Sequence, residues 1–370
     1  MKIAIVLNTS WNIYNFRMNF VRELISQGHE VHTIAPVDDY TNYLTEAGCV
    51  HHRITMDSRG ANPIKDSALI FELFWLYKRV RPDIILHFTI KPNIYGTLAA
   101  AMLKIPVINN VCGLGTVFLK KNIVSAVAVF LYRISFRFAN RVFFQNAQDR
   151  DLFIGKRLVP EHAADLVPGS GIDLQKFYPT PFKRNNKFTF LLISRLITDK
   201  GILEYIEAIK KLRAEGVDAR FQILGAKDPE HKRGIQLKVI EGWIKSDTVE
   251  YLGTTNDVRS FIHQADCIVL PSYREGTPRT LLEAASSSKP IIATDVPGCN
   301  NVVVNEFNGL LCKLKDSDDL AEKMKIMSSY EDSLLESFGK NGRAKMEGEY
   351  GESLVINKYL HALKEIKKAS

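Results

Sequence analysis

The sequence predicts an α/β protein of two domains, each built around a parallel sheet with crossover helices. Short apolar runs alternate with segments of helical periodicity along the whole chain, which is the pattern of repeated βαβ units. A chain of 370 residues with 46% hydrophobic content is also long for one core and suits two domains of ordinary size. A turn-rich stretch at 168–171 and a polar linker at 179–186 separate the two halves.

The first domain is expected over residues 1–178, and its strands are predicted from short apolar runs bounded by turns or helical patterns. A helix from about 15 to 27 ends before Gly28, a typical C-terminal stop. The first apolar run is too short for a signal peptide, and no stretch approaches the ~18 apolar residues of a membrane span. The predicted strands are 2–7, 30–35, 84–88, 106–110 and 141–145.

The second domain is expected over residues 179–349. The same reasoning predicts its strands at 187–194, 219–225, 248–252, 266–270 and 290–294. A final helical pattern covers residues 350–370. Two such halves are expected to form a cleft between facing carboxyl ends of strands, where ligands of open α/β sheets bind.

Positive charge is concentrated in the first domain. The formal net charge is +8, and no acidic residue occurs between Asp83 and Asp149. A one-signed stretch indicates an anionic partner, which is a nucleic acid, an anionic lipid or a diphosphate substrate. The basic residues of this stretch are Lys91, Lys104, Lys120, Lys121, Arg133, Arg137 and Arg141.

Part of this stretch, residues 122–140, reads as one amphipathic helix. Its apolar residues recur at helical spacing, with Arg133, Arg137 and Arg141 alongside. Apolar and basic faces together suit a helix that lies on anionic lipid, whereas the alternative is a core-facing helix with solvated arginines. The apolar positions are Ile123, Val127, Phe130, Ile134 and Phe138.

Two carboxylates, Glu275 and Glu283, lie eight positions apart across a predicted strand–turn–helix junction. The apolar run 267–270 precedes the turn, and a helical pattern begins near Thr280. Helix N-termini at the carboxyl ends of strands attract anions. Carboxylates accept hydrogen bonds from hydroxyls, so the pair suits a sugar and a ribose that flank a diphosphate. The alternative for Glu283 is a glutamate favoured only by the helix dipole.

A second pair, Arg195 and Lys200, lies at the end of the strand 187–194 and the start of the next helix. A planar guanidinium and a compact ammonium five positions apart can hold a diphosphate from two sides.

These motifs resemble the E-x7-E signature of the retaining GT-B glycosyltransferases of family 4 (glycosyl transferases group 1). Residues 13–17, 91–96 and 113–118 are similar to the branch that acts on polyprenyl-diphosphate-linked saccharides in bacterial surface glycan synthesis. The resemblance implies two Rossmann-like doubly wound domains, with the helix 350–370 packed back on the first. Further matching features are Ser194-Arg195, Lys200-Gly201, Gly253, Pro271-Ser272 and Asn308-Gly309-Leu310.

The resemblance also implies roles in the second domain. Glu275, Arg195 and Lys200 would be catalytic: the glutamate at the donor-sugar hydroxyls, the two cations at the β-phosphate of the leaving group. Glu283 would bind the ribose diol. Arg279 would be either a further diphosphate contact or a surface cation. The remaining donor-binding residues would be Gly276, Thr277, Pro278 and Thr280.

In the first domain, the expected acceptor-binding residues follow two strands. Many relatives have a histidine before the Gly-Leu-Gly turn, but this chain has Cys112 there, and His87 lies upstream as a strand-end residue. In a retaining reaction the leaving diphosphate would then take the acceptor proton itself. The expected acceptor-binding residues are Ser10, Asn15, Arg17, Lys91 and Asn93.

No metal or other cofactor is expected. The triplet 316–318 spells the D-x-D motif of manganese-binding transferases, but it immediately precedes a predicted helix at 319–327 and suits an N-cap. Five scattered cysteines without a C-x-x-C pair indicate reduced thiols.

The expected activity is transfer of a hexose or N-acetylhexosamine, GalNAc or GlcNAc, from a UDP-sugar to an undecaprenyl-diphosphate-linked saccharide with retention. The pathway would be O-antigen (lipopolysaccharide), capsule or N-glycan precursor synthesis, and the place the cytoplasmic, inner face of the cell membrane. One alternative is a sugar-nucleotide epimerase of the same fold. A nucleic-acid-binding protein is the other, but no recognised module is present.

Overall fold

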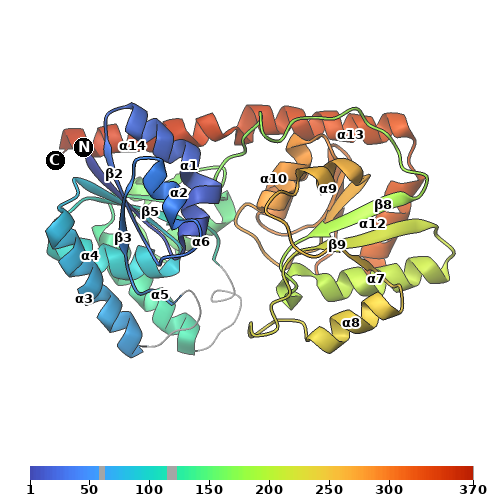
Figure 1. Ribbon diagram of the computed structural model, residues 1–370, viewed down its shortest axis with the longest axis horizontal. Coiled ribbons are helices and arrows are strands. Elements are labelled where there is room, and N and C mark those ends of the chain that lie inside the picture. Colours follow the sequence, from blue (N-terminus) through green and yellow to red (C-terminus); the bar gives the residue numbers. More distant parts are fainter. Residues whose placement is uncertain (58–62, 115–122, 370) are drawn as a thin grey trace. The chain divides into compact units, whose positions relative to one another are not determined.

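The computed structural model describes residues 1–57, 63–114 and 123–369, and the chain forms two compact units (Figure 1). One unit comprises residues 1–170 with 355–370, and the other comprises residues 171–354. The sequence placed the first boundary at 178/179, later than observed. Ile172 and Phe177 are buried in the core of the second unit, so the packing of the segment 171–178 assigns it there.

The first unit contains a seven-stranded parallel sheet in the order β3-β2-β1-β4-β5-β6-β7. The five predicted strands are present, and β3 and β7 at the two edges were missed. Edge strands are partly solvated, so β3 reads Val-His-His-Arg rather than as an apolar run. The strands are β1 (Lys2–Val6), β2 (Glu30–Ala35), β3 (Val50–Arg53), β4 (Ile84–Phe88), β5 (Val107–Val111), β6 (Arg141–Phe144) and β7 (Ala164–Leu166).

Helices cover both faces of this sheet (Figure 1). One face packs against α1 (Ser10–Ser26), α2 (Thr41–Glu46) and α14 (Glu352–Ala369). Against the other face pack α3 (Pro63–Val80), the π-helical turn η1 (Pro92–Gly96), α4 (Thr97–Met102), α5 (Ile123–Ser135), the short 3-10 turn η3 (Phe136–Phe138) and α6 (Ala147–Gly155). A further 3-10 turn, η4 (Glu161–Ala163), precedes β7.

The C-terminal helix α14 belongs to the core of the first unit through Tyr359. Its ring lies 5.0 Å from that of Phe20, 6.2 Å from that of Phe88 and 5.2 Å from that of Phe143. Its hydroxyl donates a hydrogen bond of 2.5 Å to Asn110 Oδ1. The buried hydroxyl is thereby satisfied, as burial requires.

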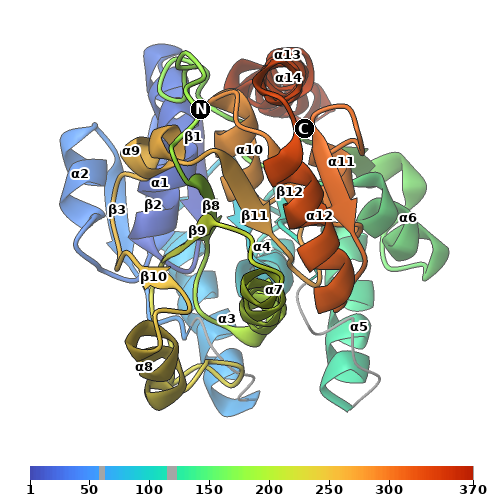
Figure 2. The ribbon, with the colours of Figure 1, turned by 90° about the vertical axis from the view of Figure 1, so that its right-hand side faces the viewer.

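The second unit contains a six-stranded parallel sheet in the order β10-β9-β8-β11-β12-β13 (Figure 2). The edge strand β13 was missed, because it is short and begins with glycine. The strands are β8 (Phe188–Ile193), β9 (Ala219–Leu224), β10 (Glu250–Tyr251), β11 (Cys267–Leu270), β12 (Ile291–Thr294) and β13 (Gly309–Cys312). On one face lie α7 (Ile202–Ala214), α8 (Leu237–Lys245) and α12 (Ser317–Ser329), and on the other α9 (Arg259–Gln264), α10 (Arg279–Ser286) and α11 (Cys299–Val302). The 3-10 turn η5 (Thr198–Lys200) precedes α7, and α13 (Asp332–Lys345) and the π-helical turn η6 (Met346–Tyr350) follow α12.

Both sheets have a doubly wound strand order. Successive strands are first added on one side of the first strand of the sheet, and the later strands are added on its other side. The switch points lie between β1 and β4 in the first unit and between β8 and β11 in the second. In open α/β sheets, ligands bind outside the carboxyl ends of strands at such points. In the described ranges, no helix is both long and apolar enough to cross a bilayer.

Candidate active site

The loops after β8 and β11 meet at the switch point of the second unit. Gly201, at the start of α7, has a φ of +69°, and a Cβ added there would lie 2.0 Å from the carbonyl oxygen of Pro271. Tyr273 N donates to the carbonyl oxygen of Asp199 at 2.8 Å, and Ser272 Oγ donates to the same oxygen at 3.1 Å. Only glycine permits this approach, so Gly201 brings the Lys200 loop against the loop that contains Glu275.

Lys200 and Glu275, predicted to act on the phosphate and the sugar, form an ion pair. Lys200 Nζ and Ser272 Oγ both donate to Glu275 Oε1, the latter at 2.6 Å. The two charged side chains are 23% and 13% exposed, so each partner reduces the cost of burying the other. The tertiary structure thus joins residues that are 75 positions apart in the sequence.

A third loop contributes Gly298, which the sequence analysis missed. This glycine has a φ of +88°, and an added Cβ would lie 2.5 Å from the carbonyl oxygen of Glu275. Glu275 N also donates to the carbonyl oxygen of Pro297 at 3.3 Å. The Pro-Gly pair after the strand β12 is a turn signal that was available in the sequence. The segment 297–298 therefore packs against the backbone of Glu275 and helps to hold it in place.

Glu283 lies on α10 and is paired with Arg279 one helical turn earlier. Arg279 Nε donates to Glu283 Oε1 at 3.0 Å, and Arg279 NH1 donates to the carbonyl oxygen of Gly171 at 3.0 Å. The surface-cation interpretation of Arg279 is wrong, because its side chain is mostly buried and bonded within the protein. Burial raises the pKa of Glu283, and Arg279 opposes this increase most strongly.

The remaining donor-site candidates surround the start of α10. Pro278 is the N-cap residue of that helix, and Gly276 and Thr277 precede it in the loop. Thr280 Oγ1 donates to the carbonyl oxygen of Ile193 at 3.1 Å. The hydroxyl of Thr280 thus ties α10 to β8, which leaves its backbone N–H as the group that can meet a ligand.

Arg195 is the most exposed of the candidates. Its side chain is 56% exposed, and its NH1 lies 3.8 Å from Asp228 Oδ2. Nearby, Arg233 forms an ion pair with Asp199 in the loop that precedes Lys200. No local pattern pointed to Arg233, because it lies in an irregular loop after β9. Arg195 is therefore less fixed in this structure than Lys200.

The acceptor candidates on α1 differ in accessibility. Thr9, not a residue near 15, begins the helix as its N-cap, since its side chain accepts from Asn12 N at 3.1 Å. Ser10 is consequently buried in the helix rather than placed in a loop, and its Oγ donates to the carbonyl oxygen of Pro36 at 3.1 Å. Asn15 is partly exposed, with Nδ2 bonded to the carbonyl oxygen of Trp11 at 3.0 Å.

Arg17 is a buried cation, with 5% of its surface exposed. Its guanidinium carbon lies 4.6 Å from the centre of the Phe88 ring, and NH1 donates to the carbonyl oxygen of Phe16 at 2.9 Å. Its Nε has no hydrogen-bond partner among the described residues. A buried cation without a carboxylate is costly, so this guanidinium is suited to an anion from outside the protein.

Lys91 and Asn93, after β4, are already bonded within the first unit. Lys91 Nζ lies 2.8 Å from Asp66 Oδ1. Asn93 is buried, donates to the carbonyl oxygen of Asn110 at 2.7 Å and accepts from Asn110 N at 3.2 Å. Asn93 therefore joins η1 to β5 rather than presenting its amide to a ligand.

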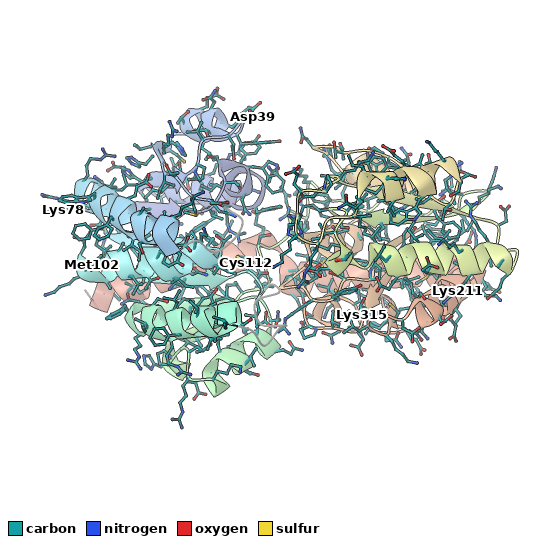
Figure 3. The ribbon with its side chains drawn as sticks, turned by 90° about the horizontal axis from the view of Figure 1, so that it is seen from below. Asp39, Lys78, Met102, Cys112, Lys211 and Lys315 are labelled. Atoms are coloured by element: carbon teal, nitrogen blue, oxygen red, sulfur yellow. The ribbon has the colours of Figure 1, made fainter. Side chains whose placement is uncertain are left out.

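His87 is a buried core residue. Tyr77 Oη lies 2.9 Å from its Nε2, and Asn109 Oδ1 lies 3.0 Å from its Nδ1. Burial lowers the pKa of His87 to about 3, so the ring is neutral at physiological pH. A Cβ at Gly96 would lie 2.5 Å from Nε2, which shows how closely the neighbouring turn covers the ring. Cys112 is partly exposed after β5 (Figure 3).

The D-x-D triplet is a helix cap. Asp316 accepts hydrogen bonds from Asp318 N at 3.0 Å and Asp319 N at 2.9 Å at the start of α12. These bonds lower its pKa, that from Asp319 most strongly. Among residues 1–57, 63–114 and 123–369, no cluster of three or more His, Cys, Asp or Glu could hold a metal ion.

The predicted helix 122–140 is wrong at its C-terminal end, because α5 ends at Ser135 and Arg141 lies in β6. Arg141 pairs with Glu365 of α14 at 2.8 Å. The apolar positions largely face away from the core: Ile123 is 83% exposed and Phe130 is 59% exposed. Gly115, Thr116, Val117, Phe118, Lys120, Lys121 and Asn122 lie outside the described residues.

Comparisons with known proteins agree with this geometry. The family model described as "Glycosyl transferases group 1" matches residues 176–345, and that described as "Glycosyl transferase 4-like" matches residues 2–146. The N,N'-diacetylbacillosaminyl-diphospho-undecaprenol alpha-1,3-N-acetylgalactosaminyltransferase of Campylobacter jejuni is 30% identical over 97% of both chains. A UDP-Gal:alpha-D-GlcNAc-diphosphoundecaprenol alpha-1,3-galactosyltransferase of Escherichia coli is 28% identical over 78% of this chain and 76% of that protein.

Solved structures show the same fold. A glycosyltransferase from Rickettsia africae superposes with a TM-score of 0.81 at 18% identity, covering 100% of this chain and 99% of that one. Anabaena HepE in complex with UDP and glucose gives a TM-score of 0.81 at 17% identity, covering 98% and 99%.

Fold and sequence together define a GT-B glycosyltransferase. Within that class, the chain belongs to the group 1, or family 4, glycosyltransferases.

Proposed function

We propose that this enzyme transfers an N-acetylhexosamine or hexose, GalNAc first among them, from a UDP-sugar to an undecaprenyl-diphosphate-linked saccharide, with retention. The names of the two relatives above support this acceptor class and an α-linkage. The observation that most favours a nucleotide-sugar donor is the convergence of Lys200 and Glu275 at the switch point between β8 and β11.

The proposed reaction needs charge stabilisation at the leaving group. The bond between the anomeric carbon and the β-phosphate oxygen breaks, and negative charge develops on the diphosphate. Lys200, with Arg195 moving in from its exposed position, neutralises that charge. The acceptor oxygen forms the new bond on the same face of the sugar. Its proton passes to the departing phosphate oxygen, so no side chain is required as a base.

Glu275 then has two successive partners. Without donor, its Oε1 accepts from Lys200 and Ser272. With donor, Lys200 turns to the phosphate, and Glu275 accepts hydrogen bonds from the sugar hydroxyls. Lys200 thereby exchanges one anionic partner for another, and Glu275 exchanges an ammonium group for hydroxyl donors, so both groups stay hydrogen-bonded throughout.

Arg17 is the proposed contact of the acceptor diphosphate in the first unit. It is buried and has no carboxylate within ion-pair distance in the part of the chain that the structure describes. Lys91 is a weaker candidate, since Asp66 already neutralises it. Arg17 therefore replaces the pair of cations expected from the sequence as the principal anion contact.

The membrane surface is the proposed location of the acceptor. Helices α3, α4 and α5 cover one face of the first sheet (Figure 1). Large apolar side chains of these helices are exposed. Lys78 lies 4.9 Å from the centre of the Trp75 ring, and Figure 3 shows Lys78 and Met102 at the outside of this layer. Apolar side chains interspersed with cations suit an anionic interface. We call Phe71, Trp75, Met102, Ile123, Val127 and Phe130 the apolar face.

A product assay tests the proposed activity. The full-length enzyme is incubated with a panel of UDP-sugars and a short undecaprenyl-diphosphate-linked saccharide, and products are identified by mass spectrometry. Anomeric proton couplings of the product then give the stereochemistry. One UDP-sugar should yield an extended, α-linked lipid. Epimerised UDP-sugar formed without acceptor would instead establish the epimerase, and a β-linked product would exclude retention.

A further inference from the structure

Arg279 occupies an unusual position for a cation beside a nucleotide-sugar site. It is the first residue of α10, and helix N-termini favour negative rather than positive charge. A cation here requires compensation. Glu283, one turn later, supplies it through the hydrogen bond from Arg279 Nε to Glu283 Oε1.

The second bond of Arg279 reaches the segment that enters the second unit. We call residues 171–178 the entry segment. Arg279 NH1 donates to the carbonyl oxygen of Gly171, and the guanidinium carbon lies 5.9 Å from the centre of the Phe177 ring. At the other end of α10, Ser286 Oγ donates to the carbonyl oxygen of Phe177 at 2.6 Å. The entry segment thus fixes the guanidinium, which in turn fixes the carboxylate.

One oxygen of Glu283 remains available. Within the described ranges, Oε1 accepts from Arg279, and no protein group bonds to Oε2. A carboxylate oxygen beside a helix N-terminus can accept both hydrogens of a cis-diol. This requires that the carboxyl is ionised and that its rotation is stopped.

We propose that Arg279 is a positioning residue that holds Glu283 as an oriented carboxylate for the ribose diol of the donor. This inference rests on the proposed function, in which Glu283 binds that ribose. Arg279 itself does not touch the nucleotide. The hydrogen bonds that it donates to Glu283 and to the carbonyl oxygen of Gly171 transmit the rigidity of the entry segment to the carboxylate.

The charges around Glu283 favour this role. Burial raises the pKa of Glu283, and the charge of Arg279 and its hydrogen bond lower it. Lys176 of the entry segment also lowers it, whereas Asp257 of the loop before α9 raises it. Without Arg279, the pKa rises. The neutral acid then forms within a pH range in which the wild-type group is ionised.

The test measures how strongly the protein prefers UDP over 2′,3′-dideoxy-UDP, by calorimetry at pH 8 and pH 6. The wild type should prefer UDP by about tenfold or more at both, the contribution of a hydrogen bond to a charged acceptor. Arg279→Gln, which no longer stops the rotation of the carboxylate, should lose part of this preference at pH 8 and the rest at pH 6, where the carboxyl is neutral. Arg279→Lys, which restores the cation, should retain the preference at both. Glu283→Gln and the double variant should show none at either pH.

Two results would overturn the inference. If Arg279→Gln kept the full preference for UDP at pH 6, Glu283 would bind the diol without being ionised and oriented by Arg279. An equal loss at both pH values, in a variant with an unchanged melting temperature, would indicate lost packing without a role for charge. If the wild type does not bind UDP, the proposed donor class fails. The same comparison with ADP, GDP and CDP and their 2′,3′-dideoxy forms then tests Arg279 independently, and failure of all four nucleotides overturns both proposals.

Discussion

The two units share a strand order but treat charge at their switch points differently. In the second unit, Lys200 pairs with Glu275 and Arg279 with Glu283, so each charge has a partner before any ligand arrives. In the first unit, Arg17 is buried with no carboxylate of the described residues within ion-pair distance, and a network of neutral groups surrounds His87. One scaffold therefore supports a pre-paired site, suited to a charged nucleotide, and an unpaired cation, suited to an incoming anion.

Outer surfaces differ as well. Four of the six residues of the apolar face, Met102, Ile123, Val127 and Phe130, lie in the stretch between Asp83 and Asp149, which contains no acidic residue. In the second unit, exposed helices carry ion pairs of both signs, such as Lys325 with Glu215 and Lys211 with Asp318 (labelled Lys211 in Figure 3). Mixed charge favours water, whereas apolar and basic side chains favour an anionic interface.

The largest effect is expected at Glu275. Glu275→Gln keeps the size of the side chain but removes its charge, so Lys200 loses its partner and the sugar hydroxyls lose a strong acceptor. Turnover with saturating donor should fall by ~10²–10³-fold, as for the loss of one preorganised transition-state contact. Steady-state rates, with circular dichroism to verify folding, measure this. Glu241→Gln on the exposed face of α8 is the control, and near-normal turnover of folded Glu275→Gln would contradict the assigned role.

Lys200→Ala should have a comparable or slightly smaller effect. It removes one partner of a buried pair, and we expect a loss of roughly 2–4 kcal/mol in transition-state stabilisation. Arg195→Ala should cost less, because Arg195 is exposed in this state. Steady-state rates of the two variants are compared with those of Lys210→Ala, the control. The wild-type rate is also measured with and without EDTA. If EDTA abolished wild-type turnover and Mn²⁺ restored it, the charge would come from a metal instead.

The difference between the outer surfaces of the two units predicts an intermediate effect on membrane binding. Arg133→Gln with Arg137→Gln should weaken binding to anionic vesicles by about 2 kcal/mol, or ~30-fold, at about 1 kcal/mol for each basic residue. Arg141 is left out because Glu365 holds it. High salt should reduce wild-type binding similarly. Lys210→Gln with Arg213→Gln, the same charge change on α7, is the control in vesicle sedimentation.

Apolar contacts should contribute alongside charge. Trp75→Ser with Phe130→Ser should release the protein from vesicles even at low salt, since both side chains are more than half exposed and the substitutions remove apolar surface that would contact the bilayer. UDP affinity of the second unit should not change. Equal sedimentation of this variant and the wild type would show that the apolar face does not meet lipid.

The smallest effect concerns acid stability, which should differ between the units. Burial lowers the pKa of His87 to about 3, and that of His52 to about 4. A depressed histidine pKa means that the unfolded chain binds protons first, so stability is constant above about pH 6.5 and declines as pH falls from there toward the folded pKa. For the fully buried His87, this amounts to roughly 1.4 kcal/mol per pH unit.

Tryptophan fluorescence separates the units in this experiment. Trp11 and Trp75 report on the first unit and Trp243 on the second. Trp243→Phe leaves only the tryptophans of the first unit, and Trp11→Phe with Trp75→Phe leaves only that of the second. The urea midpoint of each variant is measured at pH 7.5 and pH 5.5, and the decrease at pH 5.5 should be larger for the first unit. A larger acid shift in the second unit, where burial lowers the pKa of His263, would contradict the comparison.

The sequence alone determined features that depend on neighbouring residues. Buried strands such as β4 and β8 were located within a residue or two, because their period and flanking turns are local properties. The cap at Asp316 was also predicted, since a capping side chain bonds to amides two and three positions later. Glu275 and Glu283 were identified by their fixed spacing across one strand–turn–helix junction.

Only the tertiary structure decided how distant residues share space. The sequence left Arg279 open between a diphosphate contact and a surface cation, because nothing in its neighbourhood reveals the carbonyl oxygen of Gly171, which is 108 positions away. Gly201 and Gly298 are required by carbonyl oxygens that approach from other loops, and Asn93 is satisfied by a neighbouring strand. Edge strands such as β3 lack the apolar run that marks a buried strand, because their side chains are partly exposed to solvent. Local patterns specify the backbone of each element, whereas packing specifies which buried polar groups find partners and which, like Nε of Arg17, find none among the described residues.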